Sequence, residues 1–257
     1  MDMWKKGLIY RIGHFGLSLW VGWAMALLLS LTPLHGYAQT SSKVYLVAAG
    51  VADYPGNYMD LGLPANDAQA ICDLYRKNGK SNVYLLTNEQ ATVKNILSTT
   101  EKVFKKAKQN DIVIFFFSGH GGKGLFCAYD DNLSFTRLRE VFAGCKAKNK
   151  MIMADACHSG SLRQTKESKQ PAMGNVMVFL SSRTEETSME RPIMKNGFFT
   201  HSLLQAMRGK ADANKNRIVT AKELFDYVSK DVKNMTQDKQ HPVMWGNFKD
   251  DMPVIIW

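Results

Sequence analysis

The feature that most constrains the fold is a series of short apolar segments, separated by stretches with the periodicity of amphipathic helices. The most apolar of them is Asp111–Ser118 (DIVIFFFS), which has no charge after its first residue. A continuous apolar run of this length is typical of a strand that is buried on both faces. Because strands that alternate with helices favour a parallel sheet, the sequence predicts an α/β fold with helices on both faces of a mostly parallel sheet.

The same patterns locate the other elements of this fold. The chain has 257 residues and is 45% hydrophobic, which suffices for one large domain whose core needs no disulfide framework. We expect strands at Lys43–Gly50, Asn82–Thr87, Asp111–Ser118, Lys150–Asp155 and Asn175–Ser181, and helices of about 13 residues from Asn66 or Asp67 and at Thr92–Lys108, Phe135–Phe142, Phe198–Met207 and Ala221–Lys233.

The N-terminus has the layout of a secretory signal peptide. A basic segment, residues 1–14, precedes the uncharged apolar run Phe15–Leu31, and small residues occupy Gly36 and Ala38. We therefore predict that residues 1–38 are a signal peptide and that the rest is exported, as a secreted or periplasmic protein. An uncleaved N-terminal membrane anchor is the alternative, because the apolar run is nearly long enough to span a bilayer.

The net charge of +10 is compatible with three kinds of binding partner: nucleic acid, an anionic membrane and an acidic substrate. Removal of residues 1–38 lowers the charge to +8. The lysines are scattered, with no basic stripe interleaved with aromatic residues, so we expect no nucleic-acid partner and no stable membrane partner after signal removal. A basic surface- or nucleic-acid-binding module without peptidase activity is an alternative, and strongly salt-dependent DNA binding would reveal it.

Two short motifs follow predicted strands, at the sheet edge where α/β proteins bind ligands. SGHGG begins at Ser118 and contains His120, and DACHSG begins at Asp155 and contains Cys157. A thiol becomes a strong nucleophile when a neighbouring base removes its proton. We therefore predict Cys157 as nucleophile and His120 as acid–base, with the backbone N–H groups of Gly121 and Cys157 as donors to the oxyanion.

The remaining cysteines and histidines have more ordinary interpretations. No cysteine belongs to a CxxC pair, which excludes a zinc ribbon and a thioredoxin-like motif. A zinc site of His120, Cys157 and His158 has poor ligand spacing. We expect His158 to be structural, because neighbours on an extended chain point to opposite faces. We expect core thiols at Cys72, Cys127 and Cys145, and core or loop histidines at His14, His35, His201 and His241.

SGHGG followed by DACHSG resembles the caspase-like cysteine peptidases of the metacaspase and bacterial caspase-homologue type. Animal caspases carry QAC-x-G around their cysteine instead. The resemblance covers nearly all of the mature chain, including Ala52–Tyr54, Leu63–Ala68 and Ser182–Glu190. It implies a caspase-like three-layer sandwich and a Cys–His dyad of Cys157 and His120.

The resemblance also implies the organisation of the domain. We expect one peptidase domain over residues 39–257, with a large-subunit-like part to about residue 162, a basic linker at 163–174 and a small-subunit-like part at 175–257. In relatives the linker region is often cut, and exposed polar loops are favoured cleavage sites. Self-cleavage after Arg163, Lys166 or Lys169 is one interpretation of the linker, and a solvated loop is the other.

In metacaspase-like enzymes acids line the pocket for the P1 side chain, and the matching positions here are Asp67, Ser118 and Asp155. Two carboxylates in a half-buried pocket complement Lys or Arg and reject Asp, so cleavage of peptides or proteins after basic residues is expected. Asp67 could instead be a helix N-cap or first-turn acid. For Asp155 a strand end provides no helix to cap, which favours the pocket. A transpeptidase or ligase on the same dyad is an alternative activity.

A second motif, D-x-N-x-N-x₆-E, has the oxygen-ligand spacing of a calcium loop. Its ligands would be Asp212, Asn214, Asn216 and Glu223, but Arg217 replaces the glycine of the sharp turn. The alternative is a connector with Asx-turns and Thr220 as helix N-cap. We therefore expect no required cofactor, with calcium as an optional ligand of this loop. The sequence carries no signal for an oligomeric state.

Overall fold

The computed structural model describes residues 42–56, 58–122, 124–156, 175–182 and 194–257. The signal-peptide prediction, Cys157, His158 and the 163–174 linker lie outside these residues. Residues Ser41–Trp257 form one compact unit. Within the described ranges, no helix combines the length and the apolar character that a membrane span needs.

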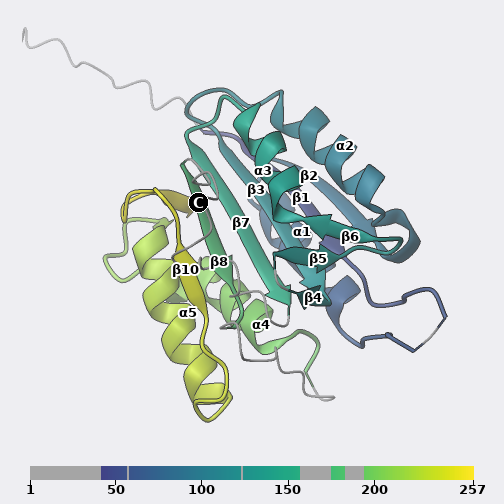
Figure 1. The fold of residues 1–257 in the computed structure, drawn as a ribbon. Coiled ribbons are helices and arrows are strands. Elements are labelled where there is room, and N and C mark those ends of the chain that lie inside the picture. The colour runs from purple at the N-terminus through teal and green to yellow at the C-terminus, as the bar shows by residue number, and fades with distance from the viewer. Residues whose placement is uncertain (1–41, 57, 123, 157–174, 183–193) are drawn as a thin grey trace, which may run out of the picture. The chain divides into compact units, whose positions relative to one another are not determined.

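A six-stranded sheet with the order β10-β8-β7-β3-β1-β2 forms the centre of the fold (Figure 1). Its first five strands in the sequence pair in parallel, and β10 joins the edge antiparallel to β8. The strands are β1 (Val44–Gly50), β2 (Ser81–Thr87), β3 (Ile112–Gly119), β7 (Asn149–Ala156), β8 (Val176–Leu180) and β10 (Val243–Trp245). The predicted mostly parallel α/β sheet is confirmed.

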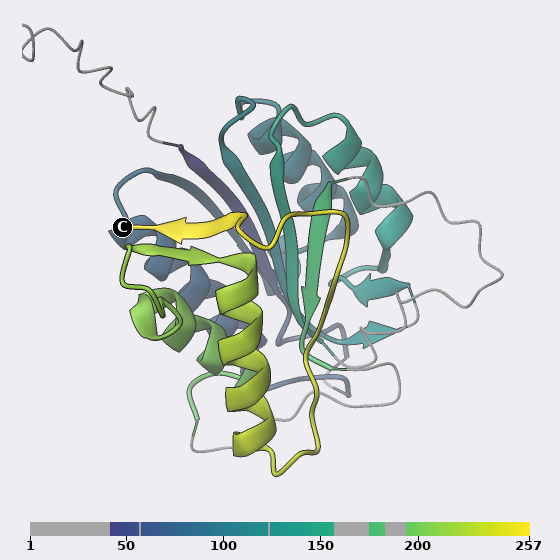
Figure 2. The same ribbon diagram turned by 90° about the vertical axis from the view of Figure 1, so that its left-hand side faces the viewer.

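Helices cover both faces of this sheet, and Figure 2 shows the layers from the side. One face packs on α1 (Pro64–Lys77), α4 (Phe198–Gln205) and α5 (Ala221–Met235), and the other packs on α2 (Val93–Phe104) and α3 (Phe135–Ala143). Along β3, Phe116 faces the first core while Phe115 and Phe117 face the second. Because alternate side chains of a strand point to opposite faces, a strand between two cores is apolar at every position.

Short elements that the sequence analysis did not predict complete the fold. A small sheet contains β4 (Gly121–Gly122), β5 (Leu125–Cys127) and β6 (Asn132–Ser134), and a second pairs β9 (Ile218–Thr220) with β11 (Pro253–Ile256). A 3₁₀ turn, η1, spans Asn88–Gln90. Strands of two to four residues are too short for hydrophobic alternation to reveal them.

Two predicted helices end earlier in the structure. The helix expected at Thr92–Lys108 ends at Phe104, where the N–H groups of Lys106 and Ala107 bond three residues back. Ala107 is still buried, so the apolar pattern continues past the helix. The helix expected at Phe198–Met207 ends at Gln205 and continues as the π-helical turn η3 (Ala206–Lys210).

Candidate active site

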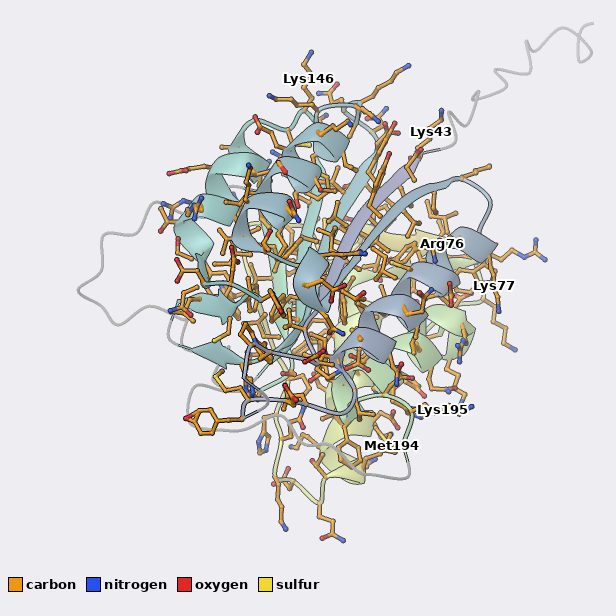
Figure 3. The ribbon with its side chains drawn as sticks, turned by 90° about the vertical axis from the view of Figure 1, so that its right-hand side faces the viewer. Lys43, Arg76, Lys77, Lys146, Met194 and Lys195 are labelled. Carbon is orange, nitrogen blue, oxygen red and sulfur yellow. The ribbon has the colours of Figure 1, made fainter. Side chains whose placement is uncertain are left out.

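The predicted site residues follow β3 and β7, which are neighbours in the sheet. Their parallel register places Ser118 beside Asp155 and Gly119 beside Ala156. The two motifs therefore begin at one edge of the sheet. Met194 and Lys195, which lead into the site, lie toward this edge, while Lys43 and Lys146 lie at the opposite end of the strands (Figure 3).

His120 is oriented by a backbone carbonyl. Its Nε2 lies 2.8 Å from the carbonyl oxygen of Met59. Because a carbonyl only accepts, we assign the proton of the imidazole to Nε2. In the neutral ring Nδ1 is then the atom that can accept a proton, as a general base must.

Tyr54 holds the backbone of His120, which the sequence analysis did not predict. Its buried hydroxyl accepts a hydrogen bond from the N–H of His120 at 3.0 Å and donates one to the carbonyl of Cys127 at 3.0 Å. Cys127 N–H also donates to the His120 carbonyl. The hydroxyl thus bridges two backbone groups that would otherwise pair directly in an antiparallel ladder. The Tyr54 ring also packs against the imidazole, with centroids 5.2 Å apart.

Gly121, one of the two predicted oxyanion donors, begins β4 at the edge of the small sheet. It is opposite Phe126, and the ladder hydrogen bond next to it joins Cys127 to His120. In an antiparallel ladder the N–H groups alternate in direction, so the Gly121 N–H points away from β5. This direction suits a donor to a bound group. The other predicted donor, Cys157, lies outside the described residues.

Asp67 is 1% exposed, and both of its carboxylate oxygens accept hydrogen bonds. Ser118 Oγ donates to Oδ2 at 2.8 Å, while Asn196 Nδ2 and the Gly197 N–H donate to Oδ1 at 2.9 and 3.1 Å. Burial, followed by the charge of Asp155, holds the pKa of Asp67 well above its ordinary value. Asp67 lies in the first turn of α1 but is not its N-cap, which is Leu63.

Asp155 binds the N-terminus of α4. Its Oδ2 accepts from the N–H of Thr200 at 3.1 Å and from the Thr200 hydroxyl at 2.9 Å. Thr200 is the third residue of α4, so the carboxylate satisfies an N–H of the first helical turn. The expectation that Asp155 has no helix to cap is therefore wrong. The helix that it caps, α4, is far from β7 in the sequence and meets the end of this strand only in the folded structure.

Gly197 lies between the two carboxylates. A Cβ atom on it would be 2.5 Å from Asp155 Oδ2 and 3.5 Å from Asp67 Oδ2. The two carboxylate oxygens are consequently within about 6 Å of each other. Any larger residue at position 197 would collide with Asp155, so the close approach of the acids requires glycine here. The structure thus brings together Asp67, Ser118 and Asp155, the three residues predicted for the P1 pocket.

The other described cysteines have the properties of core thiols, as predicted. Cys72 and Cys145 are buried, Cys127 is partly buried, and these three are free thiols. Burial raises the pKa of Cys72 to about 12 and also raises the pKa values of Cys127 and Cys145. Thiols with raised pKa values stay protonated at neutral pH and are poor nucleophiles.

The predicted calcium loop uses its oxygens within the loop itself. The Asp212 carboxylate accepts from the N–H groups of Asn216 and Arg217, and Asn216 Oδ1 accepts from Ile218 N–H. Glu223 forms a capping box with Thr220 at the start of α5. These contacts fit the connector with Asx-turns. In the part of the chain that the structure describes, no group of three His, Cys, Asp or Glu residues could hold a metal ion. Calcium binding stays a prediction.

Several predicted residues receive no structural account. The self-cleavage candidates Arg163, Lys166 and Lys169, together with Cys157 and His158, lie outside the described residues, as do His14 and His35. Of the described histidines, His241 is close to Asp238, with 3.1 Å between Nε2 and Oδ1, and His201 is on α4. The contact of His241 agrees with a structural role, whereas the structural role of His201 stays a prediction.

The fold and this sheet edge define an α/β protein of the caspase type. A family model, "Caspase domain", matches residues 45–252. The chain belongs to this family of caspase-type cysteine peptidases.

Individual relatives agree with this assignment. Metacaspase-1 of Candida albicans (strain SC5314 / ATCC MYA-2876) is 32% identical over 97 residues, which cover 35% of this chain and 21% of that relative. The match therefore spans about a fifth of the relative's length. A crystal structure of a protein from Geobacter sulfurreducens matches with a TM-score of 0.63 and 16% identity, covering 81% of this chain and 95% of that one. This second likeness concerns the fold alone.

Proposed function

We propose that this caspase-family chain is an endopeptidase that uses a Cys157–His120 dyad and cleaves after Arg or Lys. The observation that carries the proposal is the parallel register of β3 and β7, which aligns Ser118 with Asp155. His120 follows Ser118 by two residues, and Cys157 follows Asp155 by two. The strands β3 and β7 therefore end at paired residues, each of which immediately precedes the proposed base or nucleophile in the sequence.

The proposed reaction begins when His120 Nδ1 takes the proton of the Cys157 thiol. The thiolate attacks the carbonyl carbon of the scissile bond, and the N–H groups of Gly121 and Cys157 donate to the resulting oxyanion. His120 then protonates the leaving amine as the C–N bond breaks. In the second half, His120 removes a proton from water, which attacks the acyl thioester. The product acid leaves as the proton returns to the sulfur.

The preference for a basic P1 residue is supported by the two buried acids beside Ser118. Asp67 and Asp155 place two carboxylates within about 6 Å, and Ser118 donates to Asp67. A cationic P1 side chain would offset their mutual repulsion, whereas an acidic one would add to it.

The test is a panel of fluorogenic peptides that differ only at P1, assayed with residues 39–257. We expect cleavage of P1-Arg and P1-Lys peptides, and loss of cleavage in Cys157→Ala and His120→Ala with an unchanged far-UV circular dichroism spectrum. Preference for P1-Asp would overturn the specificity. Full activity of Cys157→Ala would overturn the mechanism.

Two further proposals use the same samples. Self-processing after Arg163, Lys166 or Lys169 predicts cleavage of the purified wild type but not of Cys157→Ala, as mass spectrometry of the products would show. Transpeptidation would instead yield joined peptides when an amine acceptor is added.

Calcium binding and export are the remaining proposals. Titration calorimetry of wild type against Asp212→Asn tests calcium at the 212–223 loop. N-terminal sequencing of the protein from membrane and extracellular or periplasmic fractions tests whether export is accompanied by cleavage after Ala38 or by an uncleaved anchor.

A further inference from the structure

We propose that Asn196, Gly197 and Thr200 are specificity-determining positioning residues, which hold Asp67 and Asp155 in the orientation that receives a cationic P1 side chain. The inference rests on the proposed function and deepens it. It assigns a role to a segment that neither the dyad nor the two acids include.

One short segment supplies donors to both acids. Asn196 Nδ2 and the Gly197 N–H bind Oδ1 of Asp67, and the N–H and hydroxyl of Thr200 bind Oδ2 of Asp155. The acids come from α1 and β7, which are separate elements. The segment 196–200 therefore ties two side chains from different parts of the chain to one rigid support.

The support is anchored independently of the acids. Phe199, between Gly197 and Thr200, is fully buried, and its ring packs edge-on against Phe179 of β8 with centroids 4.9 Å apart. Core packing thus sets the position of the α4 N-terminus. The hydrogen bonds then set the positions of the carboxylates relative to it.

These donors orient the acids but supply no positive charge to offset them. The amide, the two backbone N–H groups and the two hydroxyls of Asn196, Gly197, Thr200 and Ser118 carry no formal charge. Two carboxylates within about 6 Å in a buried site repel strongly, which favours the protonated form of Asp67, and a bound cation favours the ionised form of both acids. Gly197 allows this approach, because a Cβ there would meet Asp155 Oδ2 at 2.5 Å.

If the inference is correct, loss of one of these hydrogen-bond donors reduces the preference for a charged over a neutral P1 side chain. The proposed dyad is left unchanged. Citrulline is the neutral isostere of arginine, so the ratio of kcat/KM for P1-Arg and P1-citrulline peptides isolates the charge. Hydrogen bonds to charged groups contribute on the order of tenfold in an equilibrium constant. We expect the ratio to fall about tenfold in Thr200→Val and in Asn196→Ala.

The experiment compares four variants of residues 39–257 with wild type. Thr200→Val removes the hydroxyl and keeps the shape, and Thr200→Ser should restore the wild-type ratio. Asn196→Ala changes a partly exposed residue and provides a second test if Thr200→Val fails to fold. The matched control is Thr100→Val on α2, which removes a side-chain hydrogen bond from an equally buried threonine. Its ratio should equal that of wild type.

A second measurement monitors the dyad directly. The rate at which iodoacetamide alkylates Cys157, followed by peptide mass spectrometry, should be unchanged in Thr200→Val and Asn196→Ala. The citrulline peptide should be cleaved within about twofold of the wild-type rate, since a lost hydrogen bond to an acid changes only the charged interaction.

The outcomes separate the inference from the proposed function. If wild type does not distinguish P1-Arg from P1-citrulline, the proposed basic specificity fails and the inference fails with it. If wild type discriminates and both Thr200→Val and Asn196→Ala retain its ratio, the inference is overturned while the proposed function stands. A parallel fall in kcat/KM for both substrates, together with slower alkylation of Cys157, would indicate a general structural role. This result would also overturn the inference.

Discussion

Replacing Asp67 with asparagine should stabilise this protein at alkaline pH and should weaken the proposed preference for basic P1 residues. The amide keeps a hydrogen-bond partner for each atom that the carboxylate contacts, with the direction of the bond to Ser118 reversed. Its Oδ1 can accept from Asn196 and Gly197, and its Nδ2 can donate to the Ser118 hydroxyl. The substitution therefore removes a charge from the site and leaves no buried polar atom without a partner.

The size of the effect follows from the separation of the two acids. Two unit charges about 6 Å apart repel by about 3 kcal/mol at an effective dielectric constant of about 20. Burial and the charge of Asp155 raise the pKa of Asp67, so the native state keeps this proton at pH values where the unfolded chain has lost it. The contribution of Asp67 to the free energy of unfolding is fully present below the pKa that this carboxyl has in the unfolded chain. It is lost as the pH rises through the higher pKa of the native state.

The assay is urea unfolding of wild type and Asp67→Asn at a series of pH values. With an m-value of about 2–3 kcal/mol/M, relief of about 3 kcal/mol raises the midpoint by about 1 M. We expect this increase at pH 8–9 and a smaller one near pH 5. The matched control is Asp73→Asn on the same helix, whose exposed carboxylate pairs with Arg76. Exposed pairs contribute little, so its midpoint should stay near that of wild type at every pH.

Two results would refute this reasoning. A difference between Asp67→Asn and wild type that stays constant with pH would mean that ionisation of Asp67 is not its source. A less stable Asp67→Asn at pH 8 would mean that the carboxylates attract a buried cation in the free protein rather than repel each other.

The remaining predictions concern residues around the site and one helix start. Tyr54→Phe removes the hydroxyl that bonds the backbone of His120, so we expect a several-fold fall in kcat at unchanged KM and a stability loss of about 1–2 kcal/mol, measured by steady-state kinetics and urea unfolding; an unchanged kcat would contradict a positioning role. Gly197→Ala places a Cβ against Asp155 and should lower the free energy of unfolding by about 1–3 kcal/mol, unlike Gly144→Ala, whose Cβ would have an ordinary contact. Thr220→Ala removes the capping box of α5 and should cost about 1–2 kcal/mol with kcat/KM unchanged; a loss of activity would instead connect this helix to the site.

Local patterns in the sequence were sufficient for the main elements and the order of the layers. Asp111–Ser118 predicted β3 because a strand between two cores is apolar throughout, and the 3.6-residue spacing of apolar residues predicted the helices. Patterning failed where elements are very short, as in β4, β5 and β6, since two or three residues contain no period. It also overran the end of α2, where buried Ala107 continues the apolar pattern without continuing the helix.

The sequence by itself determined which residues we propose for the chemistry: His120 and Cys157 from their motifs, and Asp67 and Asp155 by resemblance. Only the tertiary structure decided what surrounds them. Asn196 binds Asp67 from 129 residues away, and Tyr54 binds the backbone of His120 from 66 residues away. The physical reason is that hydrophobic periodicity records which face of an element is buried. A buried carboxylate or hydroxyl takes its partner from whichever distant segment the packing brings to it, and no local pattern contains that choice.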